Sequence, residues 1–235
     1  MPTVARLRKL AATAQAARRI IRLGERPQHV HNVGAPGLDR LIQVLGSAPT
    51  RRRVRPPAAL VIQHPSGRSA DRERKTMSAI LRAVTDSGLE PIVIYPNSDR
   101  GHTGIIAAIE AAARKAGSPV RVERSLARDA FLHLLADVRL LVGNSSCGII
   151  EAASAGTAAV NVGDRQAGRQ RSGKSVVDCT ESYDQIQAAI VQALKKRPRL
   201  GARTCYGHGR AGRRIASVLA GTRLDDALRR KQITY

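Results

Sequence analysis

Aromatic residues are scarce in this sequence of 235 residues, which holds four Tyr, one Phe and no Trp. Base stacking on aromatic rings supplies much of the affinity of proteins that bind single-stranded nucleic acids. The formal net charge of +22 points the other way, toward an anionic partner. Because the basic residues are dispersed, a solvated arginine-rich surface is the favoured interpretation, and nucleic-acid binding is the less favoured alternative.

Cysteine is also sparse. Cys147, Cys179 and Cys205 are widely separated and form no CxxC pair, and the six histidines form no HExxH motif. An odd number of scattered cysteines argues against a disulfide framework and against a zinc site. We therefore expect no metal in this protein.

Long apolar runs are absent as well. No stretch approaches the roughly 20 apolar residues of a membrane-spanning helix, and the basic N-terminus lacks the apolar segment of a secretion signal. A hydrophobic content of 43% is typical of globular proteins. These features predict a cytoplasmic protein with no membrane partner.

Strand-like and helix-like segments alternate over most of the chain. Apolar runs rich in β-branched residues predict strands, and amphipathic stretches predict helices. We expect strands over 58–63, 92–95, 120–123, 140–142, 158–162 and 176–178, and helices over 71–87, 104–116, 127–136, 147–155 and 183–195. Repeated units of this kind predict an α/β fold, a Rossmann-like parallel sheet with helices on both faces.

The two ends of the chain have a different pattern. Near the N-terminus we expect a helix over 5–23, a strand over 30–33 and a short helix over 38–45. A linker rich in Pro and Arg follows over 47–57. Near the C-terminus we expect helices close to 209–220 and 223–231.

The segment Gly143–Ala152, GNSSCGIIEA, carries the clearest chemical signal. It joins an expected strand to an expected helix, where unpaired backbone N–H groups and the helix dipole favour an anion. Ser145 and Ser146 add hydroxyl donors, and Glu151, about one turn later, suits a pair of hydroxyls such as those of a ribose. The pattern predicts a nucleotide site, but an N-capping serine before an ordinary helix is an equally good interpretation.

Polar residues follow other expected strands too. His64, Asn97 and Gly163 each come directly after a strand, as does the turn 143–148. Ligands of open parallel sheets bind beyond the carboxyl ends of the strands. The convergence of these residues therefore supports a binding site at that edge of the sheet.

Seven stretches occur together in the order and spacing of a known family. They are Arg19–Glu25, Asn32–Asp39, Gln63–Pro65, Tyr95–Gly101, Gly143–Gly148 with Glu151, Asn161–Arg169 and Tyr206–Gly209. With these stretches the chain resembles the hydrolysing UDP-N-acetylglucosamine 2-epimerases of the sialic-acid-pathway type. The resemblance runs from about residue 10 to about residue 220.

The resemblance implies the C-terminal half of a glycosyltransferase-B-like fold, in which two Rossmann-like domains enclose the active site. Residues 1–46 then correspond to a remnant of the N-terminal domain, 47–57 to the linker, 58–205 to a Rossmann-like UDP-binding domain and 206–235 to C-terminal helices. Most of the N-terminal domain is expected to be missing, so we expect the last helices to be exposed.

The same resemblance implies roles for individual residues. It assigns His64 to catalysis, Asn97 and Asp99 to sugar contacts, and the binding of UDP to Ser145, Ser146, Glu151, Phe131, Arg165 and Arg169. His64 can assist the departure of UDP as a cation or an acid. Phe131 is equally well explained as a core residue, the two arginines as surface residues, and Asn97 and Asp99 as turn formers.

Family members convert UDP-N-acetylglucosamine to N-acetylmannosamine and UDP without a cofactor. The implied path eliminates UDP and then adds water, and its proton transfers need positioned carboxylates. The family takes most of these from the N-terminal domain, whereas residues 1–24 of this chain contain no Asp or Glu.

Three functions remain open at this point. The leading one is the nucleotide-binding half of such an epimerase, acting on UDP-N-acetylglucosamine or a related UDP-amino sugar. It would act as a homo-oligomer or with a partner chain that supplies the missing domain. The second is a UDP-sugar-binding module without catalysis, and the third is a basic nucleic-acid-binding protein.

Overall fold

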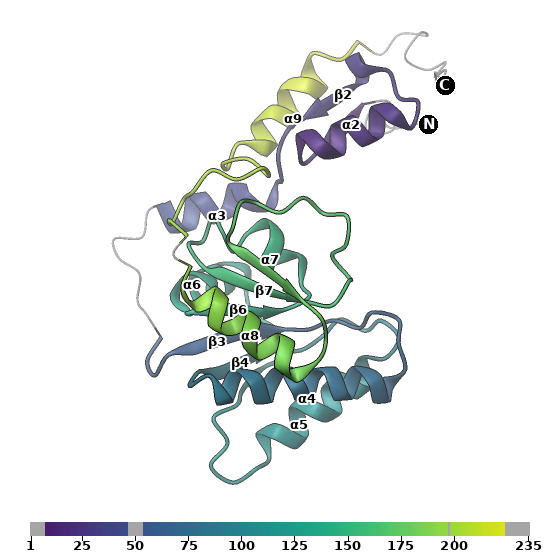
Figure 1. Cartoon of the computed structure of the whole chain (residues 1–235). Coiled ribbons are helices and arrows are strands. Elements are labelled where there is room, and N and C mark those ends of the chain that lie inside the picture. The colour runs from purple at the N-terminus through teal and green to yellow at the C-terminus, as the bar shows by residue number, and fades with distance from the viewer. Residues whose placement is uncertain (1–7, 47–53, 197, 224–235) are drawn as a thin grey trace.

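A six-stranded parallel sheet forms the centre of the computed structural model, which describes residues 8–46, 54–196 and 198–223 (Figure 1). The strands lie in the order β5-β4-β3-β6-β7-β8. Their bounds are β3 Ala58–Ile62, β4 Glu90–Ile94, β5 Arg121–Glu123, β6 Leu140–Gly143, β7 Ala158–Val162 and β8 Val176–Cys179. All five pairings are parallel, which confirms the sheet expected from the alternating pattern.

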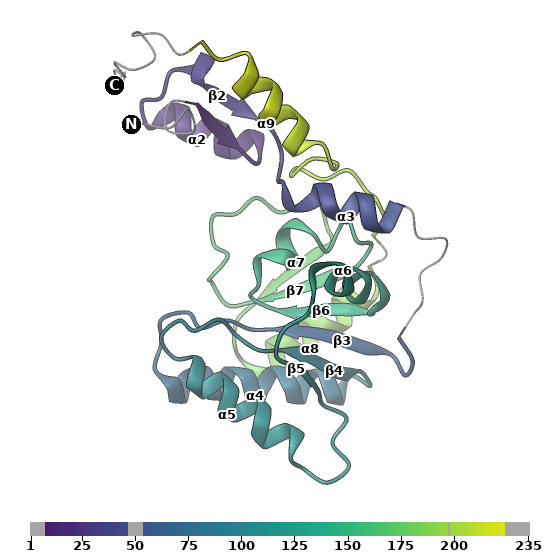
Figure 2. The same cartoon turned by 180° about the vertical axis from the view of Figure 1, so that it is seen from behind.

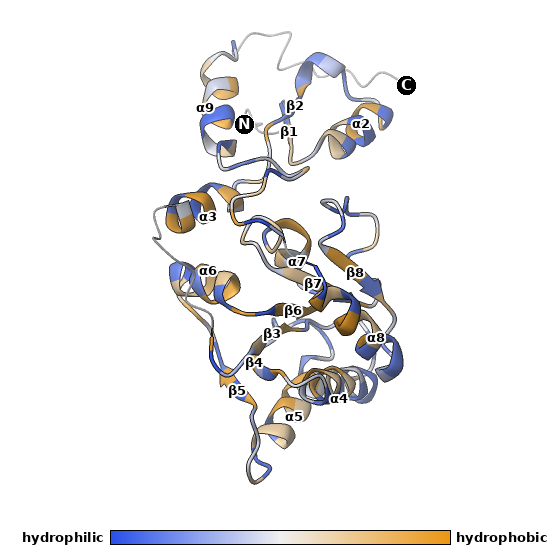
Figure 3. Ribbon diagram, turned by 60° about the vertical axis from the view of Figure 1, so that its left-hand side comes forward, coloured by the Kyte–Doolittle hydropathy of each residue, from blue (hydrophilic) through white to orange (hydrophobic). Residues whose placement is uncertain are grey.

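Helices cover both faces of this sheet. Along β3, Ala59 and Val61 pack into one apolar cluster, whereas Leu60 and Ile62 pack into the other, as the two-residue period of a strand requires. One face carries α4 Ala70–Asp86, α5 His102–Ala113 and α8 Tyr183–Leu194, and the other carries α3 Gly37–Gly46, α6 Arg128–Asp137 and α7 Ser146–Ile150. The central strands are hydrophobic, and hydrophilic residues are found mostly on the surrounding helices and loops (Figure 3).

The direction of the chain across the sheet reverses between β3 and β6. From β3 the chain moves outward to β4 and β5, then returns to place β6 on the other side of β3. The loops that follow β3 and β6 therefore leave the sheet side by side and diverge, and ligands of open α/β sheets bind at such a switch point.

A small lobe lies beyond α3 and contains both ends of the described chain (Figures 1 and 2). It consists of the parallel pair β1 Lys9–Ala11 and β2 Val30–Asn32, the helix α2 Ala14–Arg22, the 3-10 turn Pro27–His29 and the helix α9 Ala211–Ala220. The expectation of one helix over 5–23 was wrong, because residues 9–11 pair with β2 and Thr13 caps a shorter helix by accepting a hydrogen bond from the Ala16 N–H.

Helix α9 is attached to the rest of the chain mainly at its first turn. Both carboxylate oxygens of Asp39 accept backbone hydrogen bonds there, from Ala211 at 2.9 Å and Gly212 at 2.6 Å. Ala211 is the single buried residue of this helix, so the expected exposure of the late helical segment is confirmed for 211–220. Residues 47–53 of the expected linker and 224–231 of the last expected helix lie outside the described residues.

No helix in the described part of the chain is both long and apolar enough to cross a membrane.

Gly143, the last residue of β6, allows the close approach of β3 and β6. Its φ is +133°, and a Cβ built on it would lie 2.1 Å from the carbonyl oxygen of Ile62. Any side chain here would push the two strand ends apart, at the point from which both site loops emerge.

We predict that Gly143→Ala lowers the free energy of unfolding by about 3 kcal/mol or more, because it adds a backbone clash to an unfavourable φ. Gly67→Ala is the matched control, since Gly67 also has a positive φ of +79° but open space around it. The control should cost about 1–2 kcal/mol. Urea unfolding of both variants measures the difference, and equal losses would contradict the steric role of Gly143.

Candidate functional site

The turn after β6 begins the candidate site. Helix α7 covers only Ser146–Ile150, and hydrogen-bonded turns continue to Gly156, so the helix expected over 147–155 was too long. A five-residue helix has a small dipole, and any anion binding here depends more on individual donors than on the macrodipole. Glu151 is the C-cap residue, directly after the end of this helix.

The hydroxyl of Ser145 is not used to cap α7. Ser145 occupies the N-cap position, but its side chain makes no capping hydrogen bond. Its Oγ instead accepts a hydrogen bond from the Sγ of Cys147 at 3.2 Å. Burial raises the pKa of the Cys147 thiol to about 12, so this sulfur stays protonated and acts as the donor. The absence of a capping bond argues against the simple N-cap interpretation. The proton of the Ser145 hydroxyl is left for another acceptor.

Asn144 joins the two loops at the switch point. Its fully buried side chain accepts a hydrogen bond from the backbone N–H of His64 at 2.7 Å and donates one to the His64 carbonyl at 2.8 Å. The backbone carbonyl of Asn144 accepts hydrogen bonds from the side chains of Gln166 at 2.8 Å and Arg165 at 3.4 Å. One asparagine thus fixes the backbone of the histidine and the position of the 165–166 segment. It lies within the quoted GNSSCG motif, yet sequence reasoning gave it no role.

His64 is held in one orientation. Its Nδ1 accepts a hydrogen bond from the backbone N–H of Asn97 at 3.2 Å, which assigns the proton of the neutral ring to Nε2. Burial, and next the positive charge of Arg165, lower the pKa of His64 below 6.5. At neutral pH in the free protein the ring is therefore a neutral donor rather than the cation considered above.

One pocket of about 570 Å³ lies at the carboxyl ends of β3, β4 and β6, and His64, Asn97, Ser145 and Cys147 are among its lining residues. A volume of this order is typical of small-molecule sites. The pocket is lined by Ile62, His64, Ile94, Tyr95, Pro96, Asn97, Arg124, Ser125, Leu126, Arg128, Phe131, Ser145, Ser146, Cys147 and Glu151. It brings together six of the nine residues singled out from the sequence.

The pocket lining also combines a carboxylate, an aromatic ring and a guanidinium that contact one another. Arg128 donates a hydrogen bond from Nη2 to Oε1 of Glu151, and its Cζ lies 5.6 Å from the centroid of the Phe131 ring. Phe131 is half-buried at this edge of the second apolar cluster, so it both packs and lines the pocket. Arg128 belongs to no motif taken from the sequence, and its type alone gave no signal in a chain with so many arginines.

Three of the residues predicted from the sequence, Asp99, Arg165 and Arg169, lie outside the pocket lining. Arg165 is held beside it through the Asn144 carbonyl, and Asp99 accepts a hydrogen bond from the Asn97 side chain at 2.6 Å. Arg169 is exposed on the 163–171 segment, where its carbonyl accepts a hydrogen bond from Arg171. The structure therefore does not bring Arg169 together with the others.

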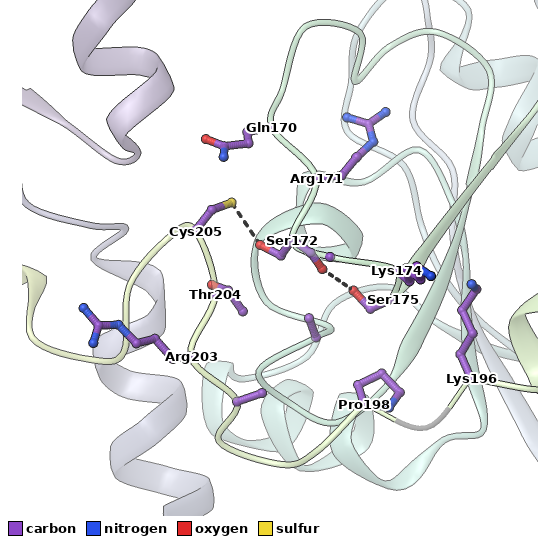
Figure 4. A pocket seen from close by; sticks show the side chains of 13 residues that line it. Gln170, Arg171, Ser172, Lys174, Ser175, Lys196, Pro198, Arg203, Thr204 and Cys205 are labelled. Atoms are coloured by element: carbon purple, nitrogen blue, oxygen red, sulfur yellow. Dashed lines mark hydrogen bonds between the residues drawn. The ribbon is translucent and has the colours of Figure 1, made fainter.

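A second pocket, of about 650 Å³, lies near the 170–175 segment and the chain that leads to α9 (Figure 4). It shares no lining residue with the first. Cys205 and Ser172 form a hydrogen bond of 3.0 Å across it, and the guanidinium of Arg171 is engaged by Asp178. Among the described residues, no group of three or more His, Cys, Asp or Glu could hold a metal ion.

Solved structures share this fold at low sequence identity. UDP-N-acetylglucosamine 2-epimerase from Neisseria meningitidis bound to UDP-GlcNAc matches with a TM-score of 0.72 at 13% identity, over 92% of this chain and 62% of that one. The Methanocaldococcus jannaschii enzyme, in complex with UDP-GlcNAc and UDP, gives 0.69 at 14% identity, over 91% and 60%. The sheet and its helices thus correspond to the C-terminal half of a glycosyltransferase-B-like fold.

Sequence relatives point in the same direction. A Legionella pneumophila protein named UDP-N,N'-diacetylbacillosamine 2-epimerase (hydrolyzing) is 34% identical over 220 residues, 88% of this chain and 56% of the relative. A Neisseria meningitidis UDP-N-acetylglucosamine 2-epimerase is 30% identical over 191 residues, 78% of this chain and 49% of the relative. The chain thus spans about half the length of these curated relatives. Since the family model for UDP-N-acetylglucosamine 2-epimerase also matches residues 3–220, the chain belongs to the UDP-N-acetylglucosamine 2-epimerase family.

Proposed function

We propose that this chain is the nucleotide-binding half of a hydrolysing UDP-N-acetylglucosamine 2-epimerase, and that its 570 Å³ pocket takes the UDP part of a UDP-amino sugar. The observation that carries the proposal is the set of groups that line the pocket. Hydroxyl donors and a histidine line it together with a buried carboxylate and an aromatic ring. These group types suit the phosphates, the ribose and the base of a nucleoside diphosphate.

The diphosphate is assigned to the turn after β6. The free hydroxyl proton of Ser145, the hydroxyl of Ser146 and the first backbone N–H groups of α7 are all suitable donors to phosphate oxygens. Arg165, held beside this turn by the Asn144 carbonyl, adds positive charge. Arg169 is a weaker candidate, because it lies outside the pocket lining.

The nucleoside is assigned to the part of the pocket that Glu151 and Phe131 line. Glu151 is only 8% exposed, and a carboxylate in this position suits the two vicinal hydroxyls of a ribose. The ring of Phe131 offers an apolar face for the uracil. Asn97, whose side chain donates to Asp99, lines the pocket next to His64 and is assigned to the sugar.

His64 is assigned to the leaving group. Its Nε2–H can donate to the diphosphate in the neutral state, and an anionic ligand beside the ring raises the pKa of His64 toward the protonated form. A protonated imidazole stabilises the negative charge that develops on UDP as its bond to the sugar breaks.

Removal of the proton at C2 of the sugar needs a base, and the pocket offers few. Glu151, its one lining carboxylate, already contacts Arg128 at the nucleoside end. We therefore propose that turnover requires further carboxylates on an element that completes the small lobe. In the described chain β1 pairs only with β2, and α2 has no buried residue. Parallel sheets are normally buried on both faces, so this edge suits additional strands of an N-terminal domain.

The second candidate is a UDP-sugar-binding module without catalysis, which the same scarcity of carboxylates favours. Binding of UDP without turnover by the chain alone fits both candidates, and release of free N-acetylmannosamine from UDP-N-acetylglucosamine once an N-terminal domain is supplied would decide for the enzyme. The absence of turnover with that domain present would decide for the module, and turnover by the chain alone would contradict the need for further carboxylates. The finer assignment to amino-sugar synthesis of the sialic-acid type depends on the sugar that is accepted.

We predict that the double variant Ser145→Ala, Glu151→Ala loses UDP binding by at least about 100-fold, because it removes one phosphate donor and the ribose acceptor. Ser78→Ala with Glu110→Ala is the matched control, since neither residue lines the pocket: Ser78 is exposed on α4, and Glu110 is half-buried on α5, where it pairs with Arg114. Isothermal titration with UDP measures both. Undiminished UDP affinity of the Ser145/Glu151 variant would remove the basis of the proposed site.

We predict that UDP binding near pH 6 takes up protons through His64. The free ring has a lowered pKa, and the bound diphosphate raises it, so the complex holds more protons than the free protein between the two values. This contribution strengthens UDP binding as the pH falls toward 6. Titration in two buffers of different ionisation enthalpy gives the proton count. His64→Gln, which retains a donor but does not titrate, should lose this uptake, and identical counts for both proteins would contradict the role.

A further inference from the structure

Arg128, the first residue of α6, contacts three groups from separate segments of the chain, two of which line the pocket. Its Nη2 donates hydrogen bonds to Oε1 of Glu151 and, at 3.1 Å, to the carbonyl oxygen of Gly37. Its guanidinium also lies over the ring of Phe131. Its side chain remains 42% exposed, so the contacts are made from the pocket wall and not from the core.

The Glu151 carboxylate has one of its oxygens occupied and the other open. The side chain is 11% exposed, and a carboxylate buried to this degree needs a charged partner, which Arg128 supplies. Oε2 accepts no hydrogen bond within the described part of the chain, and the residue lines the pocket. The start of α3 lies next to this ion pair, since a Cβ built on Gly37 would lie 3.4 Å from Oε1 of Glu151 and 3.8 Å from Nη2 of Arg128.

We propose that Arg128 is the positioning residue for ribose recognition. It holds Oε1 of Glu151 so that Oε2 faces the pocket and accepts hydrogen bonds from the ribose hydroxyls. The inference rests on the proposed UDP site and adds a specific claim to it: discrimination between ribose and 2′-deoxyribose depends on a residue that does not itself contact the ligand's ribose.

The geometry favours arginine over lysine at this position. A planar guanidinium can donate to the carboxylate and the Gly37 carbonyl while its face lies over the Phe131 ring. A lysine ammonium supplies the charge but has no plane to stack. Arg128→Lys should therefore keep part of the effect, and Arg128→Gln should lose it.

The test compares the affinities of UDP and 2′-deoxy-UDP by isothermal titration for the wild type, Arg128→Gln, Arg128→Lys and Arg72→Gln. Arg72 is the matched control, because it is an exposed arginine in the first turn of α4. Hydrogen bonds to a charged acceptor are typically worth a factor of about ten or more. We expect the wild type and Arg72→Gln to prefer UDP about tenfold, Arg128→Gln to prefer it less than about twofold, and Arg128→Lys to lie between them.

Two results would overturn the inference while leaving the UDP site intact. One is an unchanged preference in Arg128→Gln with unchanged affinities. The other is an equal loss of affinity for both nucleotides, which would mean that Arg128 contacts the phosphates or the base directly. Absence of UDP binding to the wild type would instead overturn the proposed function, and the inference with it. Thermal unfolding of each variant establishes that it is folded, and Arg128→Lys supplies the comparison if Arg128→Gln does not fold.

Discussion

The site depends on the close contact between the carboxyl ends of β3 and β6. Gly143 permits that contact because it has no Cβ, and the buried amide of Asn144 then fixes the backbone of His64 in the loop after β3. The same Asn144 backbone holds Gln166 and Arg165 through its carbonyl. A loss of this contact would separate the serine turn, the histidine and the 165–166 segment at once, which is why a glycine and an asparagine without chemical roles lie at the centre of the proposed site.

The two lobes differ in how far helices cover their sheets. The six-stranded sheet is covered on both faces, and its strands β3, β6 and β7 are entirely buried. The two-stranded lobe contacts it through few side chains, among them Arg19, which donates to the Gly168 carbonyl at 2.6 Å. The proposed nucleotide site thus belongs to the larger lobe, whereas the proton chemistry is proposed for elements that join the smaller one. The proposal therefore assigns binding and turnover to different parts of the structure.

Much of the large sheet could be predicted from the sequence, because buried parallel strands are short apolar runs bounded by turns. The strands at 58–62 and 158–162 and the helix at 70–86 were found within one or two residues. Two elements were misjudged. Residues 9–11 form a strand because of pairing with β2, which helical periodicity does not report, and α7 ends at Ile150, where the chain turns to place Glu151 in the pocket. Arg128 gave no signal at all, since it acts through partners distant in sequence.

The sequence by itself determined the fold class, the family and the set of strand-end residues, because hydrophobic periodicity and ordered motifs are local properties of the chain. The tertiary structure alone decided which of those residues meet. It placed His64, Asn97, Phe131, Ser145, Ser146 and Glu151 around one pocket, left Arg169 outside it and added Arg128. It also decided the states of two groups, since the burial that lowers the pKa of His64 and keeps the Cys147 thiol protonated comes from contacts between distant segments.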